Sequence, residues 1–390
     1  MAGRFVVIVI DSLGAGALPD AAAYGDEGAN TIGNLSRRVG GLALPNLQKW
    51  GLGNVTAIEG CPPEPRPRAS WGAMAELSQG KDTTTGHWEM MGVLLQKGFT
   101  TFPHGFPQPL MDAWLARSGA PGFLGNKPAS GTTILDELGP EHVRTGKPIV
   151  YTSADSVFQI AAHEQVVPLE TLYAWCKAAR EIGKPHGIAR VIARPFVGDG
   201  VGKYQRTYNR HDFSQPPPAD TVLARLAAKG VATVGVGKIP DIYDGQGIAR
   251  GVHTEGNADG LKKTTALLGE LGPSTFLFVN LVDTDMLYGH RRDCPGYARA
   301  LCEIDAALPS IAGQLRPGDV LALTADHGND PTFPGSDHTR EQVPLIVYAP
   351  GRTEGRPLGT RASFADLGAT VADHFGLSAP AGQSFLQALG

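Results

Sequence analysis

The sequence has few cysteines and no long hydrophobic run, and both absences exclude classes of protein. Its four cysteines, Cys61, Cys176, Cys294 and Cys302, show no CxxC spacing. We therefore expect free thiols in a reducing compartment, and neither a disulfide framework nor a zinc knuckle. The longest apolar stretches, such as FLFVNLV at 276–282, are far shorter than the roughly 20 residues of a membrane span. We expect a cytoplasmic protein with no signal peptide and no membrane anchor.

The sequence also lacks an excess of basic residues. The formal net charge is -4, and no long block of one charge sign occurs. A nucleic-acid-binding protein would carry a basic stripe or patch, so we expect no nucleic-acid partner. We also expect no obligate protein partner, and any binding of phosphate should be local to one site.

The pattern of strand candidates predicts an α/β fold with a mostly parallel sheet flanked by helices. An apolar run opens the chain at 5–10, and further runs follow at 231–238, 276–283, 320–327 and 343–350, separated by helical patterns. At 390 residues the chain is longer than a usual single domain.

The middle of the chain has helices and strands of its own. A helical pattern occurs at 172–183, strand candidates occur at 147–152 and 189–196, and proline-rich loops lie at 104–109 and 214–220. We predict a core domain formed by residues 1–99 and 213–390, and a smaller inserted α/β cap domain formed by residues 100–212.

Acidic and histidine residues follow three of the predicted strands. Six of them form one candidate set: Asp11, Asp285, His290, Asp326, His327 and His338. In open α/β sheets the carboxyl ends of the strands meet at a common crevice, so these side chains should converge. Six mixed oxygen and nitrogen ligands exceed the need of one four-coordinate ion and suit two divalent cations a few Å apart.

A simpler interpretation exists for each residue of this set. A single aspartate after a strand is often a turn residue or a helix N-cap, and a lone histidine is usually solvated. The run Asp326-His327-Gly328 followed by His338 fits less well, because such groups at a buried strand end would have a large desolvation cost without an ion or partner. The whole pattern therefore favours a metal site.

A second motif, QGKDTTTGHWEMMG at 79–92, is a hydroxyl-rich loop that leads into a predicted helix. Asp82 or a threonine in it could be no more than an N-cap. A hydroxyl at a helix N-terminus can also hold a phosphoryl group next to backbone NH groups. Beside two metal ions, such a threonine would be an activated nucleophile that forms a phosphothreonine. The motif alone leaves Thr83, Thr84 and Thr85 open.

Cationic residues of the predicted cap suggest a phosphate site. Arg194 lies in IARPF, Arg206, Arg210 and His211 lie in QRTYNRHD, and Lys238 follows a core strand. Arginines are mostly solvated surface residues, but several on neighbouring segments would suit bidentate recognition of phosphate. Ser153 and Asp155 in YTSADS could bind sugar hydroxyls, with a turn as the alternative.

Long motifs run through both predicted domains. Among them are IDSLGAGALPDA, GKDTTTGHWEMMG, YTSADSVFQIAAHE, IARPFVG, GKIPDIYDG, DTDMLYGHRRD and TADHGNDPTFPGSDHTREQVPL. In these motifs, and nearly from end to end, the chain resembles the phosphopentomutase family of the alkaline phosphatase superfamily. The resemblance implies an alkaline-phosphatase-like core and the interconversion of ribose 1-phosphate and ribose 5-phosphate, and of their 2-deoxy equivalents. It also implies a phosphothreonine enzyme, a sugar bisphosphate intermediate, and a sugar bisphosphate such as glucose 1,6-bisphosphate as primer.

The resemblance also implies roles for single residues, with two Mn²⁺ ions as cofactors. One ion would be held by Asp285, His290 and His338, and the other by Asp11, Asp326, His327 and the nucleophile, which matches Thr83. The substrate phosphate would be bound by Arg194, Arg206, His211 and Lys238, with Ser153 and Asp155 near the ribose.

Two other functions fit parts of the pattern. A metal-dependent phosphohydrolase or a phosphoglycerate mutase on the same core would share the ligands and the nucleophile loop, but YTSADS and IARPFVG favour the phosphopentomutase family. A catalytically silent phosphosugar-binding protein would have a broken ligand set or no hydroxyl after Asp82, and this chain has neither.

Overall fold

The computed structural model describes residues 2–129, 133–153 and 156–389, and it divides the chain into two compact units. Residues 1–98 and 217–390 form the first, which we call the core unit, and residues 99–216 form the inserted unit. The second junction lies after residue 216, whereas the sequence analysis placed it after residue 212. The reason is strand β8 (His211–Ser214), which pairs with β6 (Arg190–Val197) and extends the inserted sheet to the proline run at 216–218.

The described part of the core unit is built on an eight-stranded sheet in the order β10-β9-β11-β1-β12-β13-β2-β14. Its strands are β1 (Phe5–Ile10), β2 (Ser70–Met74), β9 (Ala232–Val236), β10 (Arg250–Val252), β11 (Thr275–Leu281), β12 (Val320–Thr324), β13 (Val343–Tyr348) and β14 (Pro357–Arg361). The central strands are continuous apolar runs because both faces of the sheet are covered. Of the described strands, β13 runs antiparallel to both its neighbours, so the expected mostly parallel sheet is confirmed.

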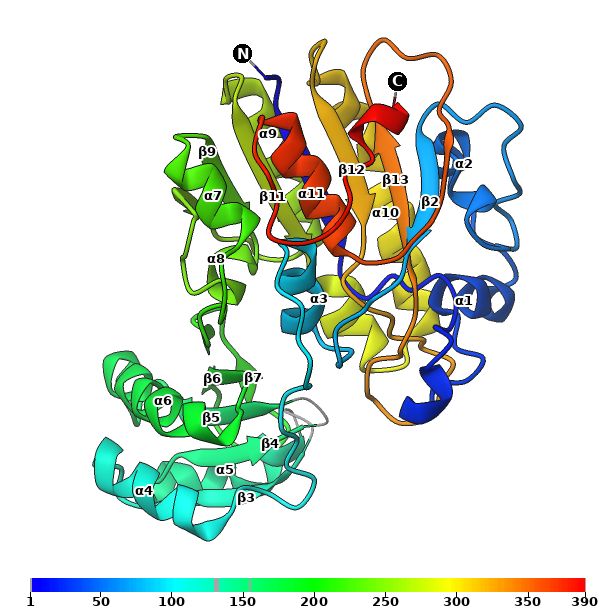
Figure 1. Ribbon diagram of the computed structural model, residues 1–390. Coiled ribbons are helices and arrows are strands. Elements are labelled where there is room, and N and C mark those ends of the chain that lie inside the picture. Colours follow the sequence, from blue (N-terminus) through cyan, green and yellow to red (C-terminus); the bar gives the residue numbers. More distant parts are fainter. Residues whose placement is uncertain (1, 130–132, 154–155, 390) are drawn as a thin grey trace. The chain divides into compact units, whose positions relative to one another are not determined.

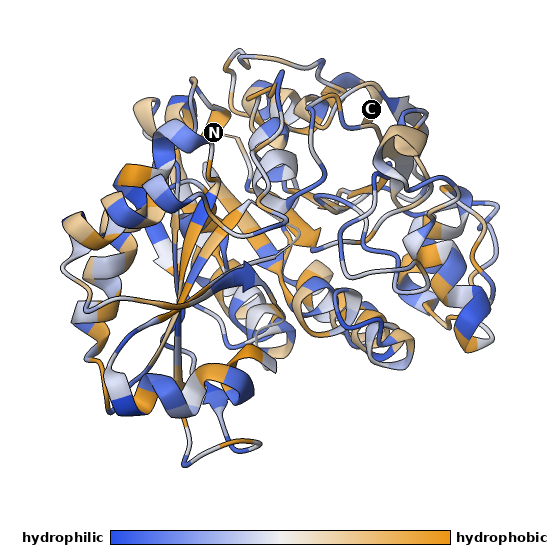
Figure 2. Cartoon of the chain, turned by 90° about the horizontal axis from the view of Figure 1, so that it is seen from below, coloured by the Kyte–Doolittle hydropathy of each residue, from blue (hydrophilic) through white to orange (hydrophobic). Residues whose placement is uncertain are grey.

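Helices cover both faces of this sheet, so the core unit has three layers with the sheet in the middle (Figure 1). On one face α10 (Cys294–Gly313) contacts α1 (Thr31–Val39), α2 (Pro45–Trp50) and α9 (Asn257–Glu270). On the other face α11 (Ala365–His374) contacts α3 (Thr83–Met90) and α7 (Val222–Ala228), and the short α8 (Ile239–Ile242) follows β9. Figure 2 shows mainly hydrophobic residues on the interior strands and both kinds of residue on the helices. Of these helices, α7 and α8 contact β9, and α8 and α9 contact β11.

Three central strands end at the same edge of the core sheet. β1 pairs in parallel with β11 on one side and with β12 on the other, and Phe5 lies opposite both Phe276 and Val320. The carboxyl ends of these strands are therefore neighbours, although they are far apart in the sequence. This edge receives the polar residues that follow each strand.

The inserted unit has a smaller sheet, whose described strands follow the order β3-β4-β5-β6-β7, with β8 paired to β6 as well. The further strands are β3 (Leu124–Pro128), β4 (Ile149–Thr152), β5 (Val157–His163) and β7 (Gln205–Arg206). α4 (Gln108–Ser118) and α6 (Leu169–Gly183) share one hydrophobic cluster, and α5 (Thr133–Thr145) belongs to another. Within the described ranges of both units, no helix combines the length and the apolar character that crossing a bilayer requires.

Candidate functional site

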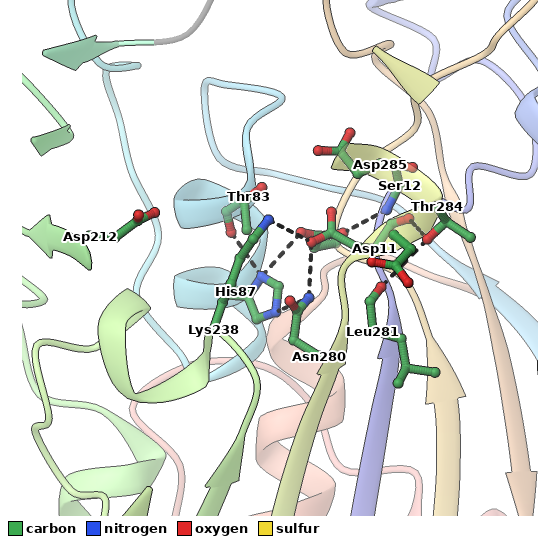
Figure 3. Close-up of polar contacts among 12 residues, drawn as sticks. Asp11, Ser12, Thr83, His87, Asp212, Lys238, Asn280, Leu281, Thr284 and Asp285 are labelled. Carbon is green, nitrogen blue, oxygen red and sulfur yellow. Dashed lines mark hydrogen bonds and ion pairs between the residues drawn. The ribbon is translucent and has the colours of Figure 1, made fainter. Parts of the chain in front are cut away.

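Three buried carboxylates gather at the shared edge of the core sheet. Asp11 comes directly after β1, and Asp326 comes two residues after β12. Asp285 lies in a π-helical turn, Thr284–Gly289, which follows β11. The hydroxyl of Thr284 donates to the carbonyl of Asp11 at 2.6 Å and so ties this turn to the end of β1 (Figure 3). Single π-helical turns often occur at functional sites, because they redirect one side chain of a helix.

The predicted histidines lie beside these carboxylates. His327 Nε2 is 3.6 Å from Asp11 Oδ1 and 3.4 Å from Asp326 Oδ2. Asp285 lies 3.2 Å from His290 Nε2 and 3.4 Å from His338 Nε2. The rings of His327 and His338 are 3.9 Å apart between centroids. The structure therefore brings all six candidate ligands together.

Two triads within this set have the geometry to hold an ion. One consists of Asp11, Asp326 and His327, and the other of Asp285, His327 and His338. His327 belongs to both, while His290 reaches the second triad through its contact with Asp285. The division into two sets of three ligands, with His290 in one of them, stays a prediction.

The charges of these groups indicate that a cation belongs here. Burial and then the neighbouring Asp326 raise the pKa of Asp11, and Lys238 opposes the rise. For Asp326, burial also raises the pKa, but His327 and His87 outweigh it and the pKa falls below its usual value. Asp11 Oδ1 accepts no hydrogen bond from any described residue. A buried carboxylate oxygen without a donor is costly, and a divalent ion would remove that cost. The donor set of carboxylates and imidazoles fits such an ion.

Helix α3 presents the candidate nucleophile to this cluster. Thr83 is its first residue, is 1% exposed, and has its hydroxyl 3.1 Å from His327 Nε2. Asp82 is the N-cap and accepts from the backbone NH groups of Thr84 and Thr85 and from the Thr85 hydroxyl. Thr84 Oγ1 is buried and makes no hydrogen bond within the described residues. Of the three threonines, Thr83 is thus the one whose hydroxyl contacts a candidate ligand.

Two further residues of the site were not predicted from the sequence. His87 Nδ1 lies 2.9 Å from the carbonyl of Thr83 and 3.2 Å from Asp326 Oδ2. Asn280 donates to Asp11 Oδ2 at 3.1 Å (Figure 3). His87 follows Thr83 by one helical turn in the motif, and Asn280 interrupts the apolar run FLFVNLV. Both signals are visible in the sequence, but only the fold shows that they converge on the carboxylates.

Lys238 lies within the cluster. Its Nζ is 3.3 Å from Asp11 Oδ2, and it follows β9 on the core unit (Figure 3). The sequence placed this lysine in a phosphate site. In the structure its ammonium group pairs with Asp11 and partly balances the charge of that carboxylate.

In the inserted unit, Arg194 and Arg206 share one face of the sheet. β6 and β7 pair so that Phe196 lies opposite Arg206, and Arg194 points to the same side as Phe196. Arg194 Nε donates to Gln159 Oε1 at 3.0 Å, and Arg206 Nη2 donates to the Tyr151 hydroxyl at 2.9 Å. Burial, together with the neighbouring arginines, holds the pKa of Arg194 well below its usual range. The guanidinium groups of Arg194, Arg206 and Arg210 are thus close enough to repel one another.

The structure does not bring His211 together with these arginines. On β8 His211 lies opposite Ala193, one residue before Arg194, and successive residues of a strand point to opposite faces. The ring of His211 packs against Phe213 and Tyr173, with centroids 4.4 and 5.7 Å apart. Its expected place in the phosphate site is therefore not supported.

Two residues, Ser153 and Asp155, were expected to contact the ribose. Ser153 follows β4 and is half-buried. Asp155 lies outside the described residues.

The sequence comparisons with known proteins agree on one family. The profile of the Metalloenzyme superfamily matches residues 3–379. The phosphopentomutase of Anaeromyxobacter sp. (strain K) is 66% identical over 98% of each chain. The phosphopentomutase of Symbiobacterium thermophilum is 56% identical over 96% of this chain and 95% of its own. Among solved structures, the PH0037 protein from Pyrococcus horikoshii is 14% identical with a TM-score of 0.49, covering 96% of this chain and 97% of that one.

Proposed function

The chain belongs to the phosphopentomutase family, and from this premise we propose that it interconverts ribose 1-phosphate and ribose 5-phosphate, and their 2-deoxy equivalents. Membership makes the chain a metal-dependent isomerase that moves a phosphoryl group of a small sugar phosphate. The finer steps, through a phosphothreonine enzyme and a sugar bisphosphate, are our proposal. One observation carries them: the Thr83 hydroxyl lies at a helix start, 3.1 Å from His327 in a cluster of buried carboxylates.

We propose that Asp11, Asp326 and His327 hold one Mn²⁺ ion and that Asp285, His290 and His338 hold a second. When bound, such ions stabilise the charge that develops on the attacking and leaving oxygens of phosphoryl transfer. The mixture of imidazole and carboxylate ligands favours a transition metal over magnesium. The unsatisfied Asp11 Oδ1 supports this assignment.

Thr83 would carry the phosphoryl group between two positions of one sugar. Its Oγ1 gives the group to the free hydroxyl of a pentose monophosphate and takes back the proton which that hydroxyl loses. The resulting bisphosphate then returns its other phosphoryl group to Thr83 Oγ1, the threonine proton passes to the sugar oxygen that is freed, and the isomeric monophosphate leaves. Asp82 caps α3 and fixes its first turn. The positive end of the helix dipole would stabilise the negative charge of the phosphoryl group that Thr83 carries.

Charged and polar side chains supply the proposed substrate contacts. Arg194 and Arg206 share a cationic face of the inserted unit and suit a phosphate group. Ser153 and Asp155 remain our proposal for the ribose hydroxyls, and Lys238 for a phosphate beside Asp11. We propose that the enzyme acts in the cytoplasm on free pentose phosphates without a protein partner.

The test is to supply the purified protein with Mn²⁺, a trace of glucose 1,6-bisphosphate and ribose 5-phosphate. Ribose 1-phosphate and inorganic phosphate are then measured together. Formation of ribose 1-phosphate without release of phosphate supports the proposal. Release of phosphate without isomer would contradict it and would indicate a hydrolase.

A further inference from the structure

Two arginines that follow candidate ligand histidines connect the loops of the site. Arg292 comes two residues after His290, and Arg340 comes two residues after His338. We propose that both are positioning residues with separable roles in the proposed mutase reaction. Arg292 orients the ligands Asp285 and His290, and Arg340 fixes the segment that leads to Thr83. The inference rests on the proposed function and deepens it.

The guanidinium group of Arg292 is surrounded by acceptors from the two ligand loops. Nη1 donates to the carbonyl of Gly289, which precedes His290, and to the side chain of Asn329 at 2.5 Å. Further hydrogen bonds reach the carbonyls of Asp330, Pro334, Gly335 and Asp337, at 3.1, 3.3, 2.7 and 3.0 Å. One side chain therefore holds the segment 329–337 against the turn that carries Asp285 and His290.

The contact with Asn329 extends to a candidate ligand. Asn329 Oδ1 accepts from Arg292, which leaves the amide nitrogen of Asn329 to face Asp285, and this nitrogen donates to Asp285 Oδ1 at 2.8 Å. His290 Nδ1 is likewise 2.6 Å from the carbonyl of Ser336, in the segment that Arg292 holds. Hydrogen bonds of this kind fix the orientation of ligand groups, and their loss weakens metal binding. Arg292 should therefore act through metal affinity.

Arg340 makes the equivalent connection towards the nucleophile. Its side chain is 1% exposed. Nη1 donates to Glu76 Oε2 at 2.7 Å and to the carbonyls of Ser78 and Gly80 at 2.9 and 2.6 Å. Nη2 donates to the carbonyl of Glu76 and to Asp20 Oδ2, both at 3.0 Å. The segment 76–80, which leads into Asp82 and Thr83, is thus held to the segment that follows His338.

The contacts of the two arginines do not overlap. Within the described residues, the side-chain hydrogen bonds of Arg340 reach no candidate metal ligand, and those of Arg292 reach no residue between 76 and 83. Loss of Arg340 should therefore displace Thr83 and leave the ions bound. A misplacement of about 1 Å at a reacting group lowers the rate by roughly 10²-fold.

Arg4 offers a matched control. It is also a buried arginine, and it donates to Asp319 and to the carbonyls of Leu268 and Gln314. It precedes β1, at the end of that strand opposite to Asp11. Its loss should affect stability but neither metal binding nor phosphorylation.

The experiment compares Arg292→Lys, Arg340→Lys and Arg4→Lys, because lysine keeps the charge and loses the planar set of donors. Mn²⁺ stoichiometry and affinity are measured by equilibrium dialysis with metal analysis. The rate of Thr83 phosphorylation by glucose 1,6-bisphosphate is measured by intact mass. Hydrogen exchange of the segments 77–82 and 329–337 is followed in the metal-free proteins.

We expect Arg292→Lys to weaken the binding of one ion by about 10–100-fold, with faster exchange at 329–337 and a phosphorylation rate that excess Mn²⁺ restores. Arg340→Lys should bind two ions as the wild type does, exchange faster at 77–82, and be phosphorylated about 100-fold more slowly at any Mn²⁺ concentration. Arg4→Lys should match the wild type in all three measurements. Equal defects in both variants, or weaker Mn²⁺ binding in Arg340→Lys, would overturn the proposal.

Two provisions keep the result decisive. If Arg340→Lys does not fold, Glu76→Ala removes one side-chain acceptor of Arg340 and should give the same slow phosphorylation with normal Mn²⁺ binding. Metal affinity and hydrogen exchange do not require mutase activity. A wild-type protein that binds Mn²⁺ and does not isomerise ribose 5-phosphate would contradict the proposed function alone, and the segment-specific exchange would still test the two arginines.

Discussion

Replacing Gly86 by alanine should displace helix α3 from the cluster of candidate metal ligands. A Cβ atom at this position of α3 would lie 2.0 Å from the carbonyl oxygen of Asp326 and 3.1 Å from its Cα. These are backbone atoms of a buried strand end and cannot rotate away. The helix would have to move instead, and Thr83 begins that helix.

The contact distances give the size of this effect. A Cβ atom is essentially never found within 3.0 Å of a neighbouring heavy atom such as this carbonyl oxygen. A contact of 2.0 Å therefore requires a shift of about 1 Å. A shift of that size at a reacting group costs roughly 10²-fold in rate. Overpacking of a buried contact also destabilises by about 1–3 kcal/mol, which leaves a large domain folded.

The assay is the turnover of ribose 5-phosphate at saturating Mn²⁺, together with thermal unfolding of the same samples. Gly269→Ala in α9 is the control, since the nearest atom outside its own helix is the flexible Gln314 Oε1 at 3.7 Å. That change should leave activity intact and stabilise the helix by about 0.5–1 kcal/mol. If Gly86→Ala retains the activity of the wild type, the close packing of α3 on Asp326 is not what places Thr83.

Other changes test other parts of the site. Thr83→Ala should lower turnover by about 10⁴-fold or more while Mn²⁺ binding stays intact, and a phosphothreonine at Thr84 or Thr85 by peptide mass spectrometry would contradict this. His338→Ala should raise the Mn²⁺ concentration for half-maximal activity by roughly 100-fold, and unchanged activity at low Mn²⁺ would remove it from the ligands. Asp212→Asn should destabilise the inserted unit by about 3–5 kcal/mol at pH 7 in denaturant unfolding, because Asp212 is buried with Arg190 and Arg210. Burial raises the pKa of Asp212, but the arginines outweigh burial and hold the pKa below the usual value of 3.8. The ionised carboxylate therefore contributes its full stability above that pH, and the difference in stability between wild type and variant should shrink only below about pH 4.

The sequence was informative where a local pattern and one general rule of sheet topology were enough. Asp11 and Asp326 follow apolar runs that can only be buried strands, and in parallel strands such residues meet at one edge. The same logic placed Asp285, although its π-helical turn could not be predicted. The expected mostly parallel sheet followed from the same apolar runs.

Two kinds of contact could not be predicted. One depends on which face of a strand a side chain occupies, and the other depends on segments that are far apart in the sequence lying side by side in the fold. His211 and Arg194 lie on paired strands, but which face each occupies depends on the register of β6 and β8, and a shift of one residue would reverse it. Arg292 and Arg340 gave no sequence signal beyond their place after a histidine. Their acceptors are mostly backbone carbonyls, which every residue has, so only the folded loops identify them.

The charge of the site explains why metal ions and phosphate should bind together. Asp11, Asp285 and Asp326 contribute three negative charges in a buried cluster, and Lys238 returns one positive charge. Without ions this cluster would repel a phosphoryl group, which carries about two negative charges at neutral pH. Two divalent ions would leave an excess of about two positive charges, which matches that group. The carboxylates would thus attract the ions and, through them, the phosphoryl group, so metal affinity and phosphate affinity should each strengthen the other.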